Sequence, residues 1–106
     1  MFIVLLRFSG ARDRAAGLME AHRQWLARGF RDGVFLLAGS LRDGAGGGIV
    51  AHGASLQALQ ARVDADPFVA EGVVSAEIVE IAPARADARL AFLLQGTPAH
   101  SGDQAR

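Results

Sequence analysis

The sequence predicts one α+β domain in which four antiparallel strands carry two helices on a single face. Three observations lead to this prediction. The chain has 106 residues, a length that suits one domain. Four short apolar runs have the composition of strands, and two longer segments have helical spacing. Taken along the chain, these segments follow the order β-α-β-β-α-β.

The first strand and the longest helix occupy the N-terminal third. Residues 2–8, FIVLLRF, are apolar and partly β-branched, and Arg7 is their single charge. Over residues 14–31 the apolar side chains recur at intervals of three and four, as on one face of a helix. That stripe consists of Ala15, Leu18, Met19, His22, Trp25, Leu26 and Phe30. Gly33 is a natural stop for the helix.

A hairpin follows the helix. Residues 34–41 and 48–52 are predicted strands, and the short connection between them is rich in glycine. A link of this length joins neighbouring antiparallel strands.

The second helix and the last strand complete the pattern. Ser55 offers an N-cap to a helix over residues 56–65. Its apolar face consists of Leu56, Leu59 and Val63. Asp66, Pro67 and Phe68 begin a separate helical turn, and residues 73–82 form the last strand.

This order of elements predicts a ferredoxin-like sandwich and a partner for it. Right-handed crossovers place both helices on one face of the four-stranded sheet. Residues 2–8 and 34–41 are apolar on both faces, however, and the helices cover only one. Because large exposed apolar patches are rare on monomers, we expect a homodimer that packs sheet against sheet.

The chain divides into two parts. Residues 1–83 form the predicted domain, and Pro83 closes it. Residues 84–106 form a C-terminal extension. Its run LAFLL, residues 90–94, is apolar enough to pack, across the dimer for example, whereas residues 96–106 have the composition of a frayed end.

Composition excludes several function classes. The 11 basic and 11 acidic side chains balance, which disfavours nucleic acid and acidic membranes as partners. Cysteine is absent, so thiol catalysis and Cys-ligated metals are excluded. Lysine, tyrosine and asparagine are also absent, which leaves proton transfer to three histidines, the carboxylates and a few hydroxyls. The apolar start is too short for a signal peptide or a membrane span, so we expect a cytoplasmic protein.

His22 and Asp66 are the candidate catalytic residues. His22 lies in the middle of the apolar stripe, where packing would hold an imidazole rigid for acid/base work. The alternative is a core histidine satisfied by one hydrogen bond. Asp66 precedes Pro67 and suits an N-cap, and it could also orient His22. The spacing of the two residues does not show that they meet.

Three further residues are candidates for substrate binding. Ser40 lies at the end of the second strand, and Arg7 could bind an anion at the mouth of a pocket. Phe68 belongs to the same turn as Asp66. The alternative for Ser40 is an ordinary serine of a strand without a binding role. The alternative for Arg7 is a charge at the edge of the sheet. His52 is expected at the surface, and His100 lies in the tail.

Other sites and folds with this element order do not fit. Gly44, Gly46, Gly47 and Gly48 join two strands, whereas a dinucleotide fingerprint opens a helix, so they predict a flexible hairpin loop or a lid. The histidines have no metal-binding spacing, and no metal or cofactor is expected. An RNA-recognition domain would have aromatic side chains in residues 48–52, which have none.

Several motifs together resemble the YciI-like (YCII-related) family. They are the FIVLLRF start, H-x-x-W-L in the first helix, L-L-A-G-S, the glycine-rich hairpin and A-D-P-F-V-x-x-G-V, and they span residues 1–83. The resemblance implies a dimeric α+β barrel. It also implies a His–Asp catalytic pair at His22 and Asp66. The family often has Ser-Gly-Pro where this chain has Ala38-Gly39-Ser40, so the hydroxyl moves from position 38 to Ser40.

Two functions remain open on the sequence. The resemblance implies a cofactor-free lyase, isomerase or dehydrohalogenase that acts on a small aromatic or anionic molecule. The alternative is a non-catalytic dimeric module that binds a small ligand or a partner.

Overall fold

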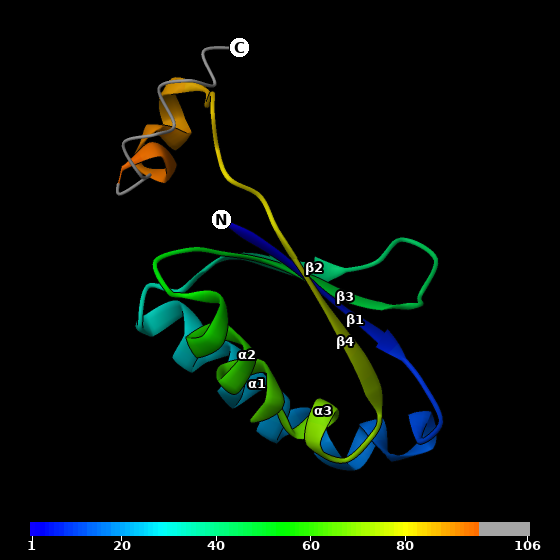
Figure 1. The fold of residues 1–106 in the computed structure, drawn as a ribbon. Helices are drawn as coiled ribbons and strands as arrows, with labels where there is room; N and C mark the ends of the chain where they lie inside the picture. Colours follow the sequence, from blue (N-terminus) through cyan, green and yellow to red (C-terminus); the bar gives the residue numbers. More distant parts are fainter. Residues whose placement is uncertain (96–106) are drawn as a thin grey trace.

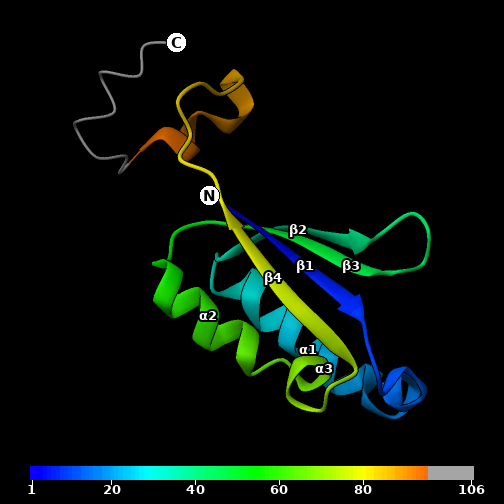
Figure 2. The same ribbon diagram turned by 45° about the vertical axis from the view of Figure 1, so that its right-hand side comes forward.

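A computed structural model describes residues 1–95 and shows the predicted sandwich (Figure 1). The sheet contains β1 (Phe2–Phe8), β2 (Phe35–Ser40), β3 (Gly46–Ala51) and β4 (Val74–Glu80). Its order is β2-β3-β1-β4, and all neighbours are antiparallel. Both long helices lie on one face of the sheet (Figures 1 and 2). The predicted α+β, ferredoxin-like fold is therefore confirmed.

The helices begin and end close to the predicted positions. They are α1 (Ala15–Arg31), α2 (Leu56–Asp64) and the short α3 (Pro67–Ala70). A 3-10 turn, η1 (Arg12–Arg14), precedes α1 in a segment that lies mostly outside the predicted strand and helix. The Ser55 hydroxyl accepts the backbone N–H of Ala58 and caps α2, as predicted.

Alternation along β1 determines which side chains enter the core. Phe2, Val4 and Leu6 are buried on the helix-bearing face, and Ile3 and Leu5 lie on the open face. The core is completed by Trp25, Phe35, Ile49, Ala51, Leu59, Val63, Phe68, Val73 and Val74.

A bulge in β2 changes which of its residues face the helices. The pairing shifts between Phe35 and Leu37, so that Leu37 lies beside Val50 on the open face. Ala38 and Ser40 then pair with Ile49 and Gly47, on the helix-bearing face. This register matters for the site, because it brings the Ser40 hydroxyl to the same side as α1.

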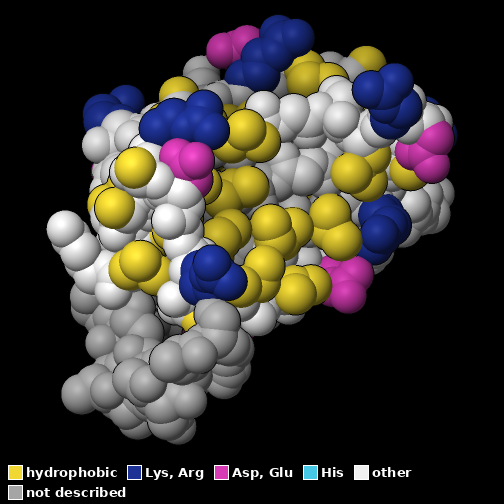
Figure 3. All heavy atoms as spheres, turned by 90° about the horizontal axis from the view of Figure 1, so that it is seen from above, with side chains coloured by type: hydrophobic (Ala, Val, Ile, Leu, Met, Phe, Trp, Pro, Cys, Tyr) yellow, Lys and Arg dark blue, Asp and Glu magenta, His cyan; other side chains and the backbone are white. Residues whose placement is uncertain are grey.

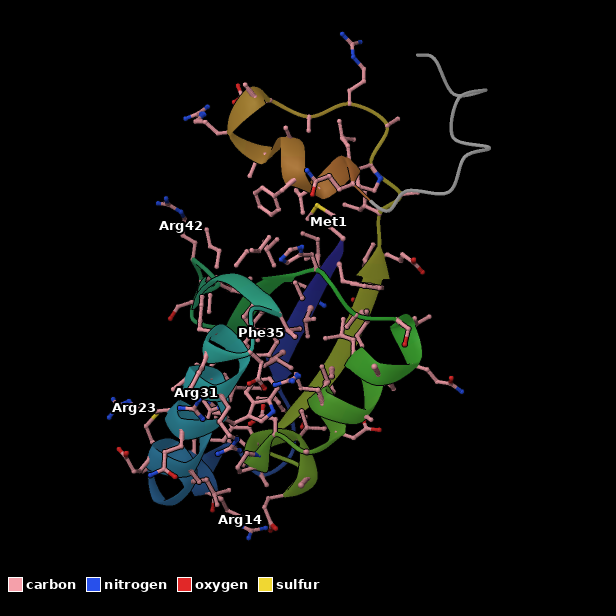
Figure 4. The ribbon with its side chains drawn as sticks, turned by 90° about the vertical axis from the view of Figure 1, so that its left-hand side faces the viewer. Met1, Arg14, Arg23, Arg31, Phe35 and Arg42 are labelled. Atoms are coloured by element: carbon pink, nitrogen blue, oxygen red, sulfur yellow. The ribbon has the colours of Figure 1, made fainter. Side chains whose placement is uncertain are left out.

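Close approach of α1 to β2 requires a glycine. A Cβ at Gly29 would overlap the ring of Phe35, which points into the space between α1 and the sheet (Figure 4). The Phe35 ring also meets Trp25 edge-on at 5.1 Å between centroids. Trp25 in turn donates its indole N–H to the carbonyl of Arg62 at 2.9 Å, which ties α1 to α2.

Two predicted core positions are wrong. Phe30 is 44% exposed and Leu56 is 48% exposed, although each continues an apolar stripe. The Phe30 ring meets Phe35 edge-on, and Phe35 belongs to the edge strand β2. Leu56 belongs to the first turn of α2, and only the later residues Leu59 and Val63 reach the core.

Beyond β4 the chain leaves the sheet. The 3-10 segment η2 (Ala88–Leu94) follows β4 beyond the end of the sheet (Figure 1). Leu90, Phe92 and Leu94 are exposed in the single chain, and packing of this run across a dimer stays a prediction. The Phe92 ring meets His52 at 5.2 Å between centroids, and His52 is half-buried where we expected a surface residue. The predicted frayed end, residues 96–106 with His100, lies outside the described residues.

The open face of the sheet carries an apolar patch. Side chains of Ile3, Leu5, Leu37, Val50 and Val79 lie on it, and Leu37 is 60% exposed. Seen from that side, hydrophobic side chains gather over the strands and charged groups lie around them (Figure 3). In residues 1–95, no helix has both the length and the apolar character that crossing a membrane requires.

Candidate active site

A histidine–aspartate pair joins α1 to the start of α3. Nδ1 of His22 lies 2.8 Å from Oδ1 of Asp66, although the two residues are 44 positions apart. The His22 side chain is 14% exposed and Asp66 is fully buried. The separation is that of a direct charge-assisted hydrogen bond.

The start of α3 fixes the Asp66 carboxylate. Asp66 is the N-cap, Pro67 occupies the first helical position, and Oδ1 accepts the backbone N–H of Phe68 at 3.1 Å. Oδ1 therefore accepts two hydrogen bonds, whereas the buried Oδ2 has no partner within residues 1–95. The capping role and the contact with His22 coexist in one side chain.

Aromatic rings hold the imidazole of His22. The ring of Phe68 is stacked on it, with centroids 4.2 Å apart and planes 8° apart. Trp25 lies one turn further along α1, with its centroid 5.8 Å from that of His22. Because these rings are part of the core, the imidazole has little freedom to rotate.

His22 opens onto a cavity of about 380 Å³ between the sheet and α1. Its walls come from β1, α1, α3, the start of β4 and the hairpin between β2 and β3. The apolar lining consists of Leu6, Phe8, Met19, Leu26, Ala38, Ile49, Phe68 and Val74. His22 and Ser40 are the polar side chains in its lining. Few polar groups among apolar walls are typical of a small-molecule site.

The second ring nitrogen of His22 is the group available to a ligand. Nε2 forms no hydrogen bond with residues 1–95, and it is not sealed from solvent as Asp66 Oδ2 is. The Oδ1 of an ionised Asp66 can only accept a hydrogen bond, so beside the ionised carboxylate Nδ1 is the donor and carries the hydrogen of the neutral ring. Nε2 then presents a lone pair that can accept a proton.

Glycines of the hairpin form the wall opposite α1. Gly44, Gly46, Gly47 and Gly48 line the cavity. Gly44 lies in the connection between the strands, but Gly46, Gly47 and Gly48 belong to β3 and are paired within the sheet, so the prediction of a flexible loop is wrong for these three. Gly46 has φ of +146°, and a Cβ there would overlap the carbonyl of Leu6. Gly46 therefore permits close backbone packing of β3 against β1 at this wall.

The structure brings Ser40 and Phe68 to the cavity but leaves Arg7 outside it. Arg7 lies on the open face of the sheet, where Nη1 donates to Glu77 at 3.1 Å. The pleat of β1 explains this, because Leu6 and Phe8 face the cavity and the residue between them must face away. Ala38 and Ser40 both line the cavity, since they are two positions apart on one strand.

Sequence reasoning missed most of the cavity wall. Phe8, Met19 and Leu26 line it, and they were assigned only to a strand and a helix stripe. Two signals in the sequence could have identified them. Phe8 alternates with the inward-facing residues of β1, and Met19 and Leu26 lie three and four residues from His22 on the same face of α1. No three His, Asp or Glu side chains in the described chain come close enough to hold a metal ion.

Comparison with known proteins identifies the family. Residues 1–84 match the YCII-related domain, which is most of the chain. The chain belongs to the YCII-related family. No curated protein sequence matches it.

A solved structure resembles this YCII-related chain in fold. It is 5-chloro-2-hydroxyhydroquinone dehydrochlorinase (TftG) from Burkholderia phenoliruptrix AC1100, in complex with 2,5-dihydroxybenzoquinone. The match has a TM-score of 0.62 and 16% identity, and it covers 76% of this chain and 93% of that one. At this identity the likeness establishes a shared fold.

Proposed function

We propose that this YCII-related protein is a cofactor-free enzyme that moves a proton on a small organic molecule. The observation that carries the proposal is the 2.8 Å contact between His22 and Asp66 beside an apolar cavity. His22 is the general base and acid, Asp66 orients it, and Ser40 and Phe68 bind the substrate. The dehydrochlorinase with the same fold supports elimination or isomerisation as the reaction class.

The chemistry follows from the hydrogen-bond pattern. Nε2 of His22 accepts a proton from an acidic carbon or hydroxyl of the substrate. The electron pair left behind either expels a leaving group or shifts a double bond. The Asp66 carboxylate stabilises the resulting imidazolium, which can then return the proton. Acid/base catalysis of this kind contributes about 10²–10⁴-fold to a rate.

Turnover of a defined panel tests this function. The panel contains chlorinated and hydroxylated hydroquinones, with chloride release, ultraviolet absorbance and deuterium uptake from D₂O as readouts. We expect His22→Gln to lower kcat by about 10²–10⁴-fold, the range of acid/base catalysis. Asp66→Asn keeps the shape and removes the charge, so it should cause a smaller loss.

The control for this experiment is His52→Gln. His52 is half-buried like His22, but it lies beside Phe92 and outside the cavity lining. It should leave turnover unchanged. Full activity in a folded His22→Gln variant would remove the catalytic role. Ligand binding without turnover in the wild type would favour a non-catalytic binding module.

We also propose that two copies pack through the open sheet face, with residues 1–83 as the paired domain. The apolar patch of Ile3, Leu5, Leu37, Val50 and Val79 supports this, because water would otherwise contact it. Charged groups surround the patch rather than interrupt its middle (Figure 3). Arg7 and Glu77 form an ion pair on the same face.

A further inference from the structure

A second arginine borders the cavity on the side that Arg7 does not reach. Arg12 lies in η1, and the carbon of its guanidinium is 4.3 Å from the centroid of the Phe8 ring. Its Nη2 donates to the carbonyl of Gly44 at 3.4 Å. Phe8 and Gly44 both line the cavity. Arg12 thus spans the rim from the end of β1 to the tip of the hairpin.

No carboxylate of residues 1–95 lies within 4.0 Å of the Arg12 guanidinium. Asp43, next to Gly44, instead accepts the backbone N–H of Ala45 at 3.0 Å. Arg14, at the end of the same turn, differs, because it pairs with Glu71 at 2.7 Å. Arg12 has five N–H donors and uses one of them in a long hydrogen bond, so most of its donors remain available.

Within residues 1–95, the cavity lining itself lacks a permanent positive charge that could bind an anionic ligand. Its lining contains no cationic side chain besides a protonated His22. An anion placed among apolar walls is costly unless a charged partner binds it. A guanidinium binds a carboxylate through two parallel hydrogen bonds and holds it in a defined orientation.

We propose that Arg12 determines specificity by binding a carboxylate of the substrate at the cavity rim. The rest of the molecule then lies against the apolar walls, with its reacting atom toward Nε2 of His22. The cation–π contact with Phe8 positions the guanidinium before the substrate arrives. The orientation toward His22 rests on the proposed function, whereas carboxylate binding at Arg12 is independent of it.

Benzoate and benzamide provide the test, because they have similar shapes and differ in charge. Their dissociation constants are measured by NMR titration on the wild type, Arg12→Gln and Arg14→Gln. We expect the wild type to bind benzoate more tightly than benzamide. Arg12→Gln should weaken the binding of benzoate by at least roughly tenfold, because it removes a charge-assisted pair of hydrogen bonds, and it should change the binding of benzamide less than twofold.

Arg14→Gln is the matched control, since it removes an arginine from the same turn but outside the rim. It should leave both constants unchanged. If Arg12→Gln weakened the binding of benzoate and benzamide equally, Arg12 would only hold the hairpin in place, and the proposal would be overturned. A wild type without preference for benzoate would overturn it too. Neither ligand reacts, so these outcomes are distinct from a failure of the catalytic proposal.

Discussion

The ring of Phe68 lies parallel to the imidazole of His22, and its backbone N–H donates to the carboxylate that binds the same imidazole. One residue therefore supports both members of the pair. Its side chain fixes the plane of the ring, and its main chain fixes the carboxylate. The short helix α3 therefore positions His22 in addition to connecting α2 to β4.

Replacing Phe68 should loosen His22 without removing the hydrogen bond at Asp66. Phe68→Leu keeps the backbone N–H and deletes the stacked ring from a buried position. We expect the free energy of unfolding to fall by about 1–3 kcal/mol. Urea unfolding followed by fluorescence of the buried Trp25, the single tryptophan, measures this change.

The control is Phe92→Leu, which changes an exposed phenylalanine outside the core. Its unfolding curve should match the wild type. An equal loss in both variants would mean that stacking on His22 contributes nothing particular to stability.

Two glycines of α1 should respond to alanine in opposite directions. A Cβ at Gly29 would overlap the Phe35 ring, whereas a Cβ at Gly17 meets nothing within 4 Å. Gly29→Ala should lower the free energy of unfolding by about 1–3 kcal/mol. Gly17→Ala should raise it by about 0.5–1 kcal/mol, because alanine favours the helix. Urea midpoints of the two variants decide the matter, and a stabilised Gly29→Ala would contradict the packing.

The hydroxyl of Ser40 should be transferable along its strand. Ala38 and Ser40 face the same cavity, so a serine at either position presents a hydroxyl there. Ser40→Ala should lower kcat/KM on a substrate from the panel by roughly tenfold, as expected for one lost hydrogen bond. Adding Ala38→Ser to that variant should restore part of the loss. Unchanged kinetics in Ser40→Ala would leave the serine a structural role only.

A charge on the open face should separate the proposed dimer. Leu37→Asp places a carboxylate in the apolar patch, while Leu56→Asp places one on an exposed turn of α2. The wild type and Leu56→Asp should sediment at twice the 11.1 kDa mass of the chain. Leu37→Asp should sediment as a monomer. A monomeric wild type would remove the proposal of sheet-to-sheet packing.

Prediction from the sequence succeeded for local patterns and failed for contacts between distant residues. Short apolar runs and helical spacing were enough to predict the four strands and the two long helices, because burial imposes both patterns. They also placed His22 on the inner side of α1. The sequence did not reveal that Asp66 meets His22, because a contact across 44 residues depends on how α3 packs against α1.

The two arginines show the opposite case. Arg7 was a candidate for substrate binding because it is the single charge in an apolar strand. It alternates with Leu6 and Phe8, however, so it lies on the open face with Ile3 and Leu5. Arg12 lies in a turn without periodicity, so no pattern predicted its place at the rim. The contact of Arg12 with Gly44 depends on the backbone path of the hairpin connection. The glycine-rich sequence of that connection is compatible with many backbone paths, so it does not predict the contact.

The cavity draws its walls from residues as far apart as Leu6 and Val74, so it exists only when the whole domain is assembled. Any molecule that occupies it must therefore favour the folded chain over the unfolded one. At a hundred times its dissociation constant, such a molecule stabilises the folded state by about 2.7 kcal/mol. A rise in melting temperature thus becomes a search tool. Compound collections can be sorted by it before any reaction is known, and the compounds that raise it are the ones to assay first.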